Sequence, residues 1–180
     1  TEALSKTPRK GPIYIYRAKA NVLSGDTLAA LEDAENALKM DKYDADAYAF
    51  RGMMRYLKRD FKDAVADYDE ALRLVGKRAD LFVNRGIARY ELNDLQGAMA
   101  DYDAVVALDA DNVVARFNRG LLRMEVGNWN GAEEDFAHVI LVEPDNDMAI
   151  YNRGIIRSNI GNHKGAIEDF TTIINEYPDF

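Results

Sequence analysis

The sequence has no cysteine, only four prolines and no apolar stretch long enough to cross a membrane. The absence of cysteine excludes disulfide bonds, thiolate metal sites and a cysteine nucleophile. A membrane helix needs roughly 18 consecutive apolar residues, so membrane insertion is not expected. The few prolines and the 12 glycines among 180 residues argue against a turn-rich all-β chain.

Motifs for catalysis and metal binding are also missing. His138 and His163 each stand alone, so a zinc hydrolase would have no ligand set. The acidic stretches 41–46 and 109–112 resemble calcium loops, but the sixth and twelfth positions of each loop carry the wrong residues. There is no phosphate-binding glycine loop and no nucleophile elbow. We therefore expect no enzyme activity, no cofactor and no metal, and we interpret both acidic stretches as turns.

Charge is distributed unevenly along the chain. The net charge is −8, which argues against binding to nucleic acid over the whole surface. The first twenty residues nevertheless carry +4, since Glu2 is opposed by five basic residues: Lys6, Arg9, Lys10, Arg17 and Lys19. Residues 1–10 are interpreted as a solvated basic leader, or else as a contact for an acidic partner. Composition leaves both a cytoplasmic and a periplasmic location open.

The sequence repeats itself with a period of 34 residues. Asn-Arg-Gly occurs at 84–86, 118–120 and 152–154, and Phe-Arg-Gly occurs at 50–52. Further columns stay in phase, namely alanine at Ala64, Ala98, Ala132 and Ala166, aspartate at Asp67, Asp101, Asp135 and Asp169, and an aromatic residue at Tyr68, Tyr102, Phe136 and Phe170. Arg17, Ala30 and Asp33 mark a weaker first copy. The repeats are thus 11–44, 45–78, 79–112, 113–146 and 147–180.

Each repeat is predicted to form two helices. In the third repeat, helical spacing of apolar residues predicts helices over about 80–92 and 95–108. Asn93, Gly127 and Gly161 are expected to take the left-handed conformation in the turn between the two helices. Pro144 and Pro178 are expected to stop second helices, because proline lacks an N–H and clashes with the preceding turn. The expected fold class is all-α.

These columns resemble the tetratricopeptide repeat family, over residues 11–180. The family pattern has a small residue at position 8, matched by Gly52, Gly86, Gly120 and Gly154, alanine at position 20 and an aromatic residue at position 24. The resemblance implies an α-solenoid, a right-handed superhelix in which first helices line the concave face. The chain departs from the pattern at positions 7 and 11, which are Arg in repeats two to five. Arg51, Arg85, Arg119 and Arg153 are expected to pair with the aspartate column, or else to bind an anionic ligand.

The concave positions of the family define a candidate peptide-binding groove. Read onto this chain, the groove residues are Phe50, Met53, Tyr56, Asn84, Ile87, Tyr90, Phe117, Asn118, Leu121, Tyr151, Asn152 and Ile155. Position 6 is asparagine in three consecutive repeats. An amide both donates and accepts, so a row of Asn84, Asn118 and Asn152 could hold a peptide backbone. Such a row resembles the asparagine ladder in the repeat arm of the O-linked N-acetylglucosamine transferases. Alternatively, these amides cap or bridge helices locally.

The carboxylate clamp of the chaperone-binding branch is absent, because position 5 is never lysine and position 2 is never basic. Binding to the acidic tail of a heat-shock chaperone is therefore not expected. Trp129, the single tryptophan, falls where the family places a packing aromatic. We interpret it as a core residue, with a binding hot spot as the alternative.

The sequence favours a non-enzymatic scaffold that binds an extended peptide or a partner protein in its concave groove. Two alternatives remain: the substrate-recruiting arm of a larger enzyme, and a self-assembly module. The last repeat has no capping helix after it, which would leave Ile173, Ile174, Tyr177 and Phe180 uncovered. We expect either that more protein follows, with further repeats, or that this end meets a partner or a second copy in a homodimer.

Overall fold

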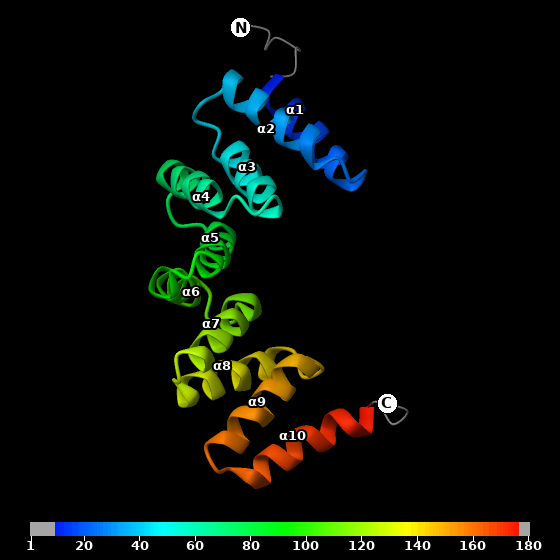
Figure 1. Ribbon diagram of the computed structural model, residues 1–180, viewed down its shortest axis with the longest axis vertical. Helices are drawn as coiled ribbons and strands as arrows, with labels where there is room; N and C mark the ends of the chain where they lie inside the picture. Colours follow the sequence, from blue (N-terminus) through cyan, green and yellow to red (C-terminus); the bar gives the residue numbers. More distant parts are fainter. Residues whose placement is uncertain (1–9, 177–180) are drawn as a thin grey trace, which may run out of the picture. The chain divides into compact units, whose positions relative to one another are not determined.

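The computed structural model describes residues 10–176, and these residues form helices, turns and no strand. The described part of the chain contains ten helices (Figure 1). Their bounds are α1 (Lys10–Leu23), α2 (Thr27–Met40), α3 (Ala45–Leu57), α4 (Phe61–Val75), α5 (Ala79–Glu91), α6 (Leu95–Leu108), α7 (Val113–Glu125), α8 (Trp129–Val142), α9 (Asp147–Asn159) and α10 (His163–Glu176). The all-α prediction is confirmed. The predicted bounds in the third repeat differ by one residue at each end of α5 and agree for α6.

Polar side chains define where many of the helices begin. The carboxylate of Asp44 accepts a hydrogen bond from the Ala47 N–H at 3.0 Å, and Asn112 and Asn146 cap α7 and α9 in the same way. Such a cap satisfies one of the N–H groups that the first helical turn leaves without a partner. The turn between repeats is therefore also the start signal for the next first helix.

The turn inside every repeat contains one residue with a positive φ at position 15. These residues are Gly25, Arg59, Asn93, Gly127 and Gly161, with φ between 61° and 83°. In the fourth repeat the next N–H, that of Asn128, returns to the carbonyl of Arg123 at 2.8 Å. This bond satisfies a carbonyl at the helix end and reverses the chain. The left-handed conformation predicted for Asn93, Gly127 and Gly161 is confirmed.

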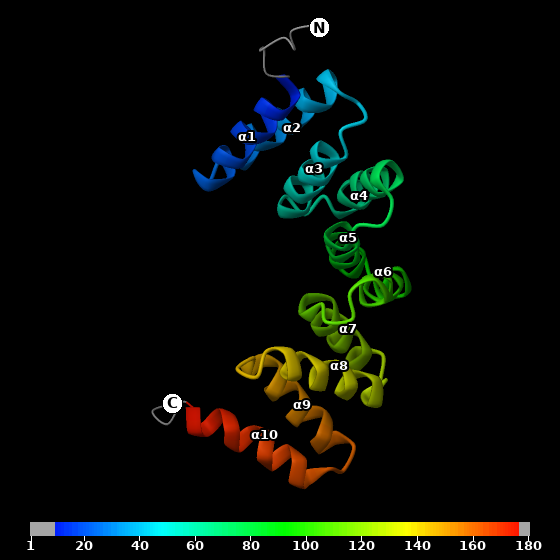
Figure 2. The same ribbon diagram turned by 180° about the vertical axis from the view of Figure 1, so that it is seen from behind.

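Within the units, the two helices of a repeat pack side by side, as α3 with α4 and α7 with α8 (Figure 2). A Cβ atom added to Gly120 would lie 3.0 Å from the ring of Phe136, and one added to Gly52 would lie 3.0 Å from the ring of Tyr68. The alanines at position 20 are buried in every repeat: Ala30, Ala64, Ala98, Ala132 and Ala166. Glycine on one helix therefore makes room for the aromatic ring of the other helix of the same repeat.

The described part of the chain divides into two compact units between Asp94 and Leu95. In the first unit, apolar clusters join α1, α2 and α3 around Phe50 and Met54, and α3, α4 and α5 around Tyr68 and Leu81. In the second unit, a cluster around Phe136 and Ile156 joins α7, α8 and α9. Each cluster bridges consecutive helices, which is how a solenoid buries apolar surface without one central core.

Trp129 and the end of α10 bear on two further expectations. Trp129 is half-buried and packs against the cluster around Phe136, as expected for a core residue. On α10, Ile173 is half-buried and Ile174 is 66% exposed. Tyr177, Pro178 and Phe180 lie outside the described residues, as do residues 1–9 of the basic leader.

Candidate functional site

The first unit contains a pocket of about 410 Å³ between the first helices of repeats one, two and three. Its apolar surface comes from Ile15 on α1 and from Ala49, Phe50 and Met53 on α3. Ile15 and Phe50 are buried, whereas Met53 is 37% exposed. These residues stand at concave positions of their repeats, so this pocket lies on the surface that the repeat pattern predicted to be a groove.

An ion-paired arginine crosses one rim of this pocket. Arg78, in the turn before α5, donates to Asp46 at 2.6 Å and to Asp80 at 2.8 and 2.9 Å. It stands where α3, α7 and α9 have a capping Asp or Asn, and its side chain makes no cap hydrogen bond. The carboxylates of Asp80 and, to a smaller extent, Asp46 raise the pKa of Arg78, so its guanidinium stays charged. Arg78 therefore joins the rims of repeats two and three.

Among the polar groups that line the pocket, those of Lys19 and Asn84 have no hydrogen-bonding or ionic partner among residues 10–176. The ammonium of Lys19 lies 5.8 Å from the ring centroid of Tyr16, and no carboxylate of the described chain pairs with it. The side-chain amide of Asn84 likewise forms no hydrogen bond within that part of the chain. Both groups line the same pocket as Phe50 and Met53. A ligand lying there could therefore meet one unpaired cation and one unpaired amide.

The second unit contains its own pocket, of about 380 Å³, between α7 and α9. Its surface comes from Val114, Phe117 and Met148, together with Asn118 and the capping residue Asn146. Val114 and Met148 are 54% and 60% exposed, so apolar surface faces the pocket here as well. The ring of Phe117 packs edge-on against Phe136, with 5.4 Å between the ring centroids.

The asparagines at position 6 do not share one environment. Asn118 donates to the Val114 carbonyl at 2.9 Å, and Asn152, which is buried, donates to the Met148 carbonyl at 2.7 Å. Each of these amides thus bonds within its own helix, which matches the local interpretation of the column. Asn84 makes no such bond among the described residues and remains available to a ligand.

The other predicted groove residues vary in exposure. Tyr90, Leu121 and Tyr151 are exposed, at 43%, 39% and 48% respectively. The half-buried members are Tyr56, Ile87 and Ile155. Of the twelve predicted residues, Phe50, Met53 and Asn84 meet in the first pocket, and Phe117 and Asn118 meet in the second. Lys19, Asp44 and Arg78 line the first pocket but were not predicted, although Lys19 falls at position 9, one of the concave positions.

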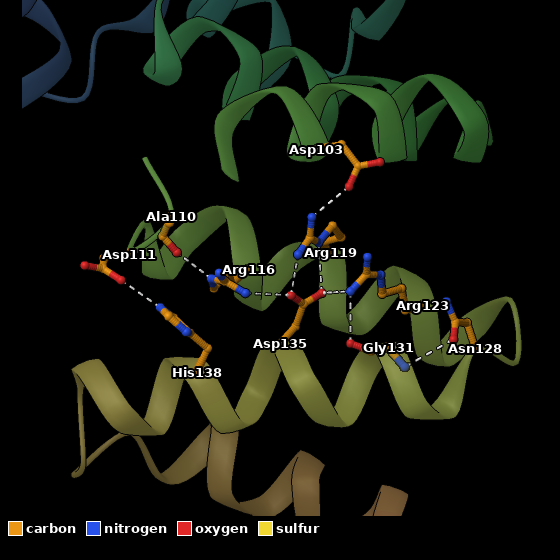
Figure 3. A network of polar contacts seen from close by, with 10 residues as sticks. All are labelled: Asp103, Ala110, Asp111, Arg116, Arg119, Arg123, Asn128, Gly131, Asp135 and His138. Atoms are coloured by element: carbon orange, nitrogen blue, oxygen red, sulfur yellow. Dashed lines mark hydrogen bonds and ion pairs between the residues drawn. The ribbon is translucent and has the colours of Figure 1, made fainter. Parts of the chain in front are cut away.

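The arginine and aspartate columns form ion pairs inside each unit. Asp135, on α8, is fully buried and accepts hydrogen bonds from three arginines of α7 (Figure 3). The Asp135 carboxylate lies 2.6 Å from Arg119, 2.8 Å from Arg123 and 3.3 Å from Arg116. Equivalent pairs in other repeats are Arg17–Asp33, Arg51–Asp67 and Arg153–Asp169. The expectation that these arginines pair with the aspartate column is confirmed for these repeats.

Two arginines of this column also pair with the preceding repeat. Arg119 also donates to Asp103 at 2.7 Å, and Arg85 donates to Asp69 at 2.5 Å. The carboxylates of Asp135 and Asp103 raise the pKa of Arg119, against the opposing effect of burial. Each of these arginines therefore ties its own repeat to the one before, and none is left free to bind an anionic ligand.

Residues 10–176 contain no group of three or more His, Cys, Asp or Glu side chains that could hold a metal ion. None of the described helices has both the length and the apolar character needed to span a membrane. His138 contacts Asp111 at 2.8 Å, on the side of α8 that faces the turn before α7 (Figure 3).

Comparisons with known proteins agree with this arrangement. A family described as tetratricopeptide repeat matches residues 17–79 and 58–113, and a second model of that description matches residues 148–179. No curated protein matches the chain.

Solved structures with a similar fold include those of three different proteins. YrrB, described as a tetratricopeptide repeat protein with an unusual peptide-binding site, is 28% identical, with 92% of this chain and 86% of YrrB covered and a TM-score of 0.78. MamA from Desulfovibrio magneticus RS-1 is 19% identical, with 93% and 95% covered and a TM-score of 0.85. PilW, described as a type IV pilus biogenesis factor, is 20% identical, with 97% and 80% covered and a TM-score of 0.81.

Proposed function

The chain belongs to the tetratricopeptide repeat family, whose members are in general protein-interaction scaffolds, and we propose that it binds an extended peptide segment of a partner protein against its first helices. The pocket between α1, α3 and α5 is the observation that carries this proposal. Its apolar surface supplies contact area, and its polar groups stand at separate points along the three helices. Recognition of this kind sums many modest contacts over a preorganised surface.

The comparison with YrrB supports the proposal. That protein is described as having a peptide-binding site, and it covers most of this chain at 28% identity. The exposed apolar residues of the second unit, such as Leu121 and Tyr151, add surface of the same character on the first helices there. A non-catalytic scaffold is the function that these features support best.

Selection from a library of random peptides tests the proposal. The immobilised protein should enrich a set of peptides, and Met53→Glu should weaken their binding at least tenfold. The reason is that the substitution puts a charge against the apolar surface that Met53 shares with Phe50. Fluorescence anisotropy with a labelled, enriched peptide measures the loss.

Met40→Glu is the matched control, because Met40 is 57% exposed in the same unit and does not line the pocket. We expect the control variant to bind the enriched peptide like the parent protein. Equal binding by the parent and by Met53→Glu would reject the pocket as the binding site.

Self-association is a second candidate, favoured by one face of α10. Ile167 and Ile174 lie seven positions apart, hence on the same side of the helix, and are 64% and 66% exposed. Sedimentation velocity over a range of concentrations tests this candidate. A single monomeric species at all concentrations would eliminate it.

A further inference from the structure

We propose that the pocket of the first unit selects peptides in which an acidic residue lies next to an apolar residue, with Lys19 holding the acid. This inference rests on the proposed peptide-binding function and specifies which peptides the pocket takes. Lys19 on α1, Met53 on α3 and Asn84 on α5 line one pocket, in the order of their helices. An extended segment crossing the three helices meets a cation, an apolar surface and a backbone-pairing amide in succession.

The carboxylates that line the pocket all have partners already. Asp46 and Asp80 share the guanidinium of Arg78, and Asp44 caps the start of α3. These acids also lie at or near the first turns of α3 and α5, where the helix dipole favours negative charge. One guanidinium and the two helix starts therefore offset part of the charge of these three carboxylates.

Lys19 differs from the rim because its charge has no compensating carboxylate in residues 10–176. Its contact with the Tyr16 ring positions the ammonium without neutralising it. An acidic side chain, or the terminal carboxylate of a peptide, would complete an ion pair at this point. The same logic applies to Asn84, whose unused amide can pair with both the N–H and the C=O of a peptide bond.

The distribution of charge along the sequence points in the same direction. Residues 1–20 carry +4, whereas the whole chain carries −8. Lys19 belongs to this basic stretch of the sequence, in which Arg17 is already paired with Asp33. Complementary charge mainly governs which partner is chosen and how fast it associates, rather than the total affinity. The apolar surface around Phe50 and Met53 supplies the remaining attraction.

Reversing the charge of Lys19 tests the inference. Random peptides are selected in parallel on the parent protein and on Lys19→Glu, and the enriched sequences are compared. We expect the parent to enrich an acidic residue beside an apolar one, and Lys19→Glu to enrich a basic residue at the same place. For one acidic peptide chosen on the parent, Lys19→Gln should weaken binding about two- to fivefold, the range of an exposed ion pair. Lys19→Glu should weaken it further.

The control variant is Lys39→Glu, an equal change of charge on α2 at an exposed lysine that does not line the pocket. It should select the same peptides as the parent. Peptides that carry no acidic preference, or that stay the same on Lys19→Glu, would overturn this inference while leaving peptide binding intact. If neither protein enriches any peptide, the proposed function fails as well, and circular dichroism of both proteins confirms that they are folded.

Discussion

Arg59 holds a backbone conformation that opposes any side chain with a Cβ atom. Its φ is 65°, and the same position is glycine in the first, fourth and fifth repeats. A left-handed conformation at a residue other than glycine lowers the stability of the fold by about 1–2 kcal/mol. Glycine removes this cost but raises the entropy of the unfolded chain, which offsets part of the gain. We expect Arg59→Gly to stabilise the protein by about 0.5–1 kcal/mol, seen as a higher midpoint of urea unfolding.

Arg59→Ala separates backbone strain from side-chain loss. The alanine variant loses the contact between Arg59 and the Phe61 ring, as the glycine variant does, but keeps the Cβ atom. It should therefore gain no stability. A rise in midpoint as large as that of Arg59→Gly would show that the side chain, rather than the backbone, is unfavourable.

Asp135 is the buried acid on which three arginines of α7 converge. Asp135→Asn keeps the shape of the side chain and removes its charge, so partly buried guanidinium groups lose their counter-charge. Breaking a buried ion pair in this way is strongly destabilising. We expect a loss of roughly 3 kcal/mol in the free energy of unfolding, measured by urea titration.

Asp103→Asn is the comparison for that result, because Asp103 pairs with the same Arg119 but is 54% exposed. Its loss should stay below about 1 kcal/mol, as for other solvent-screened pairs. Similar losses for the two variants would mean that burial of Asp135 does not set the strength of the network.

Among the elements, the starts of the helices differ in how they are capped. Asn112 accepts a hydrogen bond from the Ala115 N–H at 3.0 Å, whereas Asp60, at the start of α4, makes no side-chain cap bond. Asn112→Ala should therefore cost about 1 kcal/mol of stability. Asp60→Ala should cost clearly less, because only its charge near the helix dipole and a solvent-exposed ion pair with Lys58 are lost. Thermal unfolding followed by circular dichroism compares the two, and an equal shift would contradict the role of the cap bond.

Helices were predictable from the sequence because their signals are local and recur five times. Apolar spacing defined α5 and α6 to within one residue, and Gly127 and Gly161 marked the turns by their conformational freedom. Arg59 shows the limit of this reasoning, since nothing about arginine indicates a left-handed conformation. Only its place in the glycine column does so, and that inference requires the neighbouring repeats.

The candidate site was less predictable than the helices. Phe50, Met53 and Asn84 could be placed on the first helices from their column, and they do line one pocket. The ion pair between Arg78 and Asp46 joins residues that are 32 positions apart in the sequence. It depends on how two repeats are spaced in the fold, and the 34-residue period does not indicate that spacing. The asparagine column was ambiguous for a similar reason. A side-chain amide can form the same kind of hydrogen bond to its own helix or to a ligand, so the sequence does not decide between them.

At the scale of the whole molecule, stability should spread from repeat to repeat rather than through a common core. Contacts join each helix to its neighbours in sequence within both units, and such arrays behave as a sum of units and interfaces. In the Asp135→Asn variant we expect hydrogen exchange to accelerate most in α7, α8 and α9 and least in α1 and α2. Uniform acceleration along the chain would indicate one cooperative fold instead. Mass spectrometry of peptic fragments locates the change.

The arginine pairs have a consequence for how such a chain can change its length. Arg51, Arg119 and Arg153 each meet an aspartate 16 residues later in their own repeat, and Arg85 and Arg119 each meet one 16 residues earlier. In repeats two, four and five, the arginine and its aspartate partner thus lie within one 34-residue period. Duplication or deletion of one whole period between such repeats leaves each pairing distance intact, whereas a shorter insertion between the paired residues breaks it. The ion pairs accordingly favour growth of the array by whole 34-residue repeats.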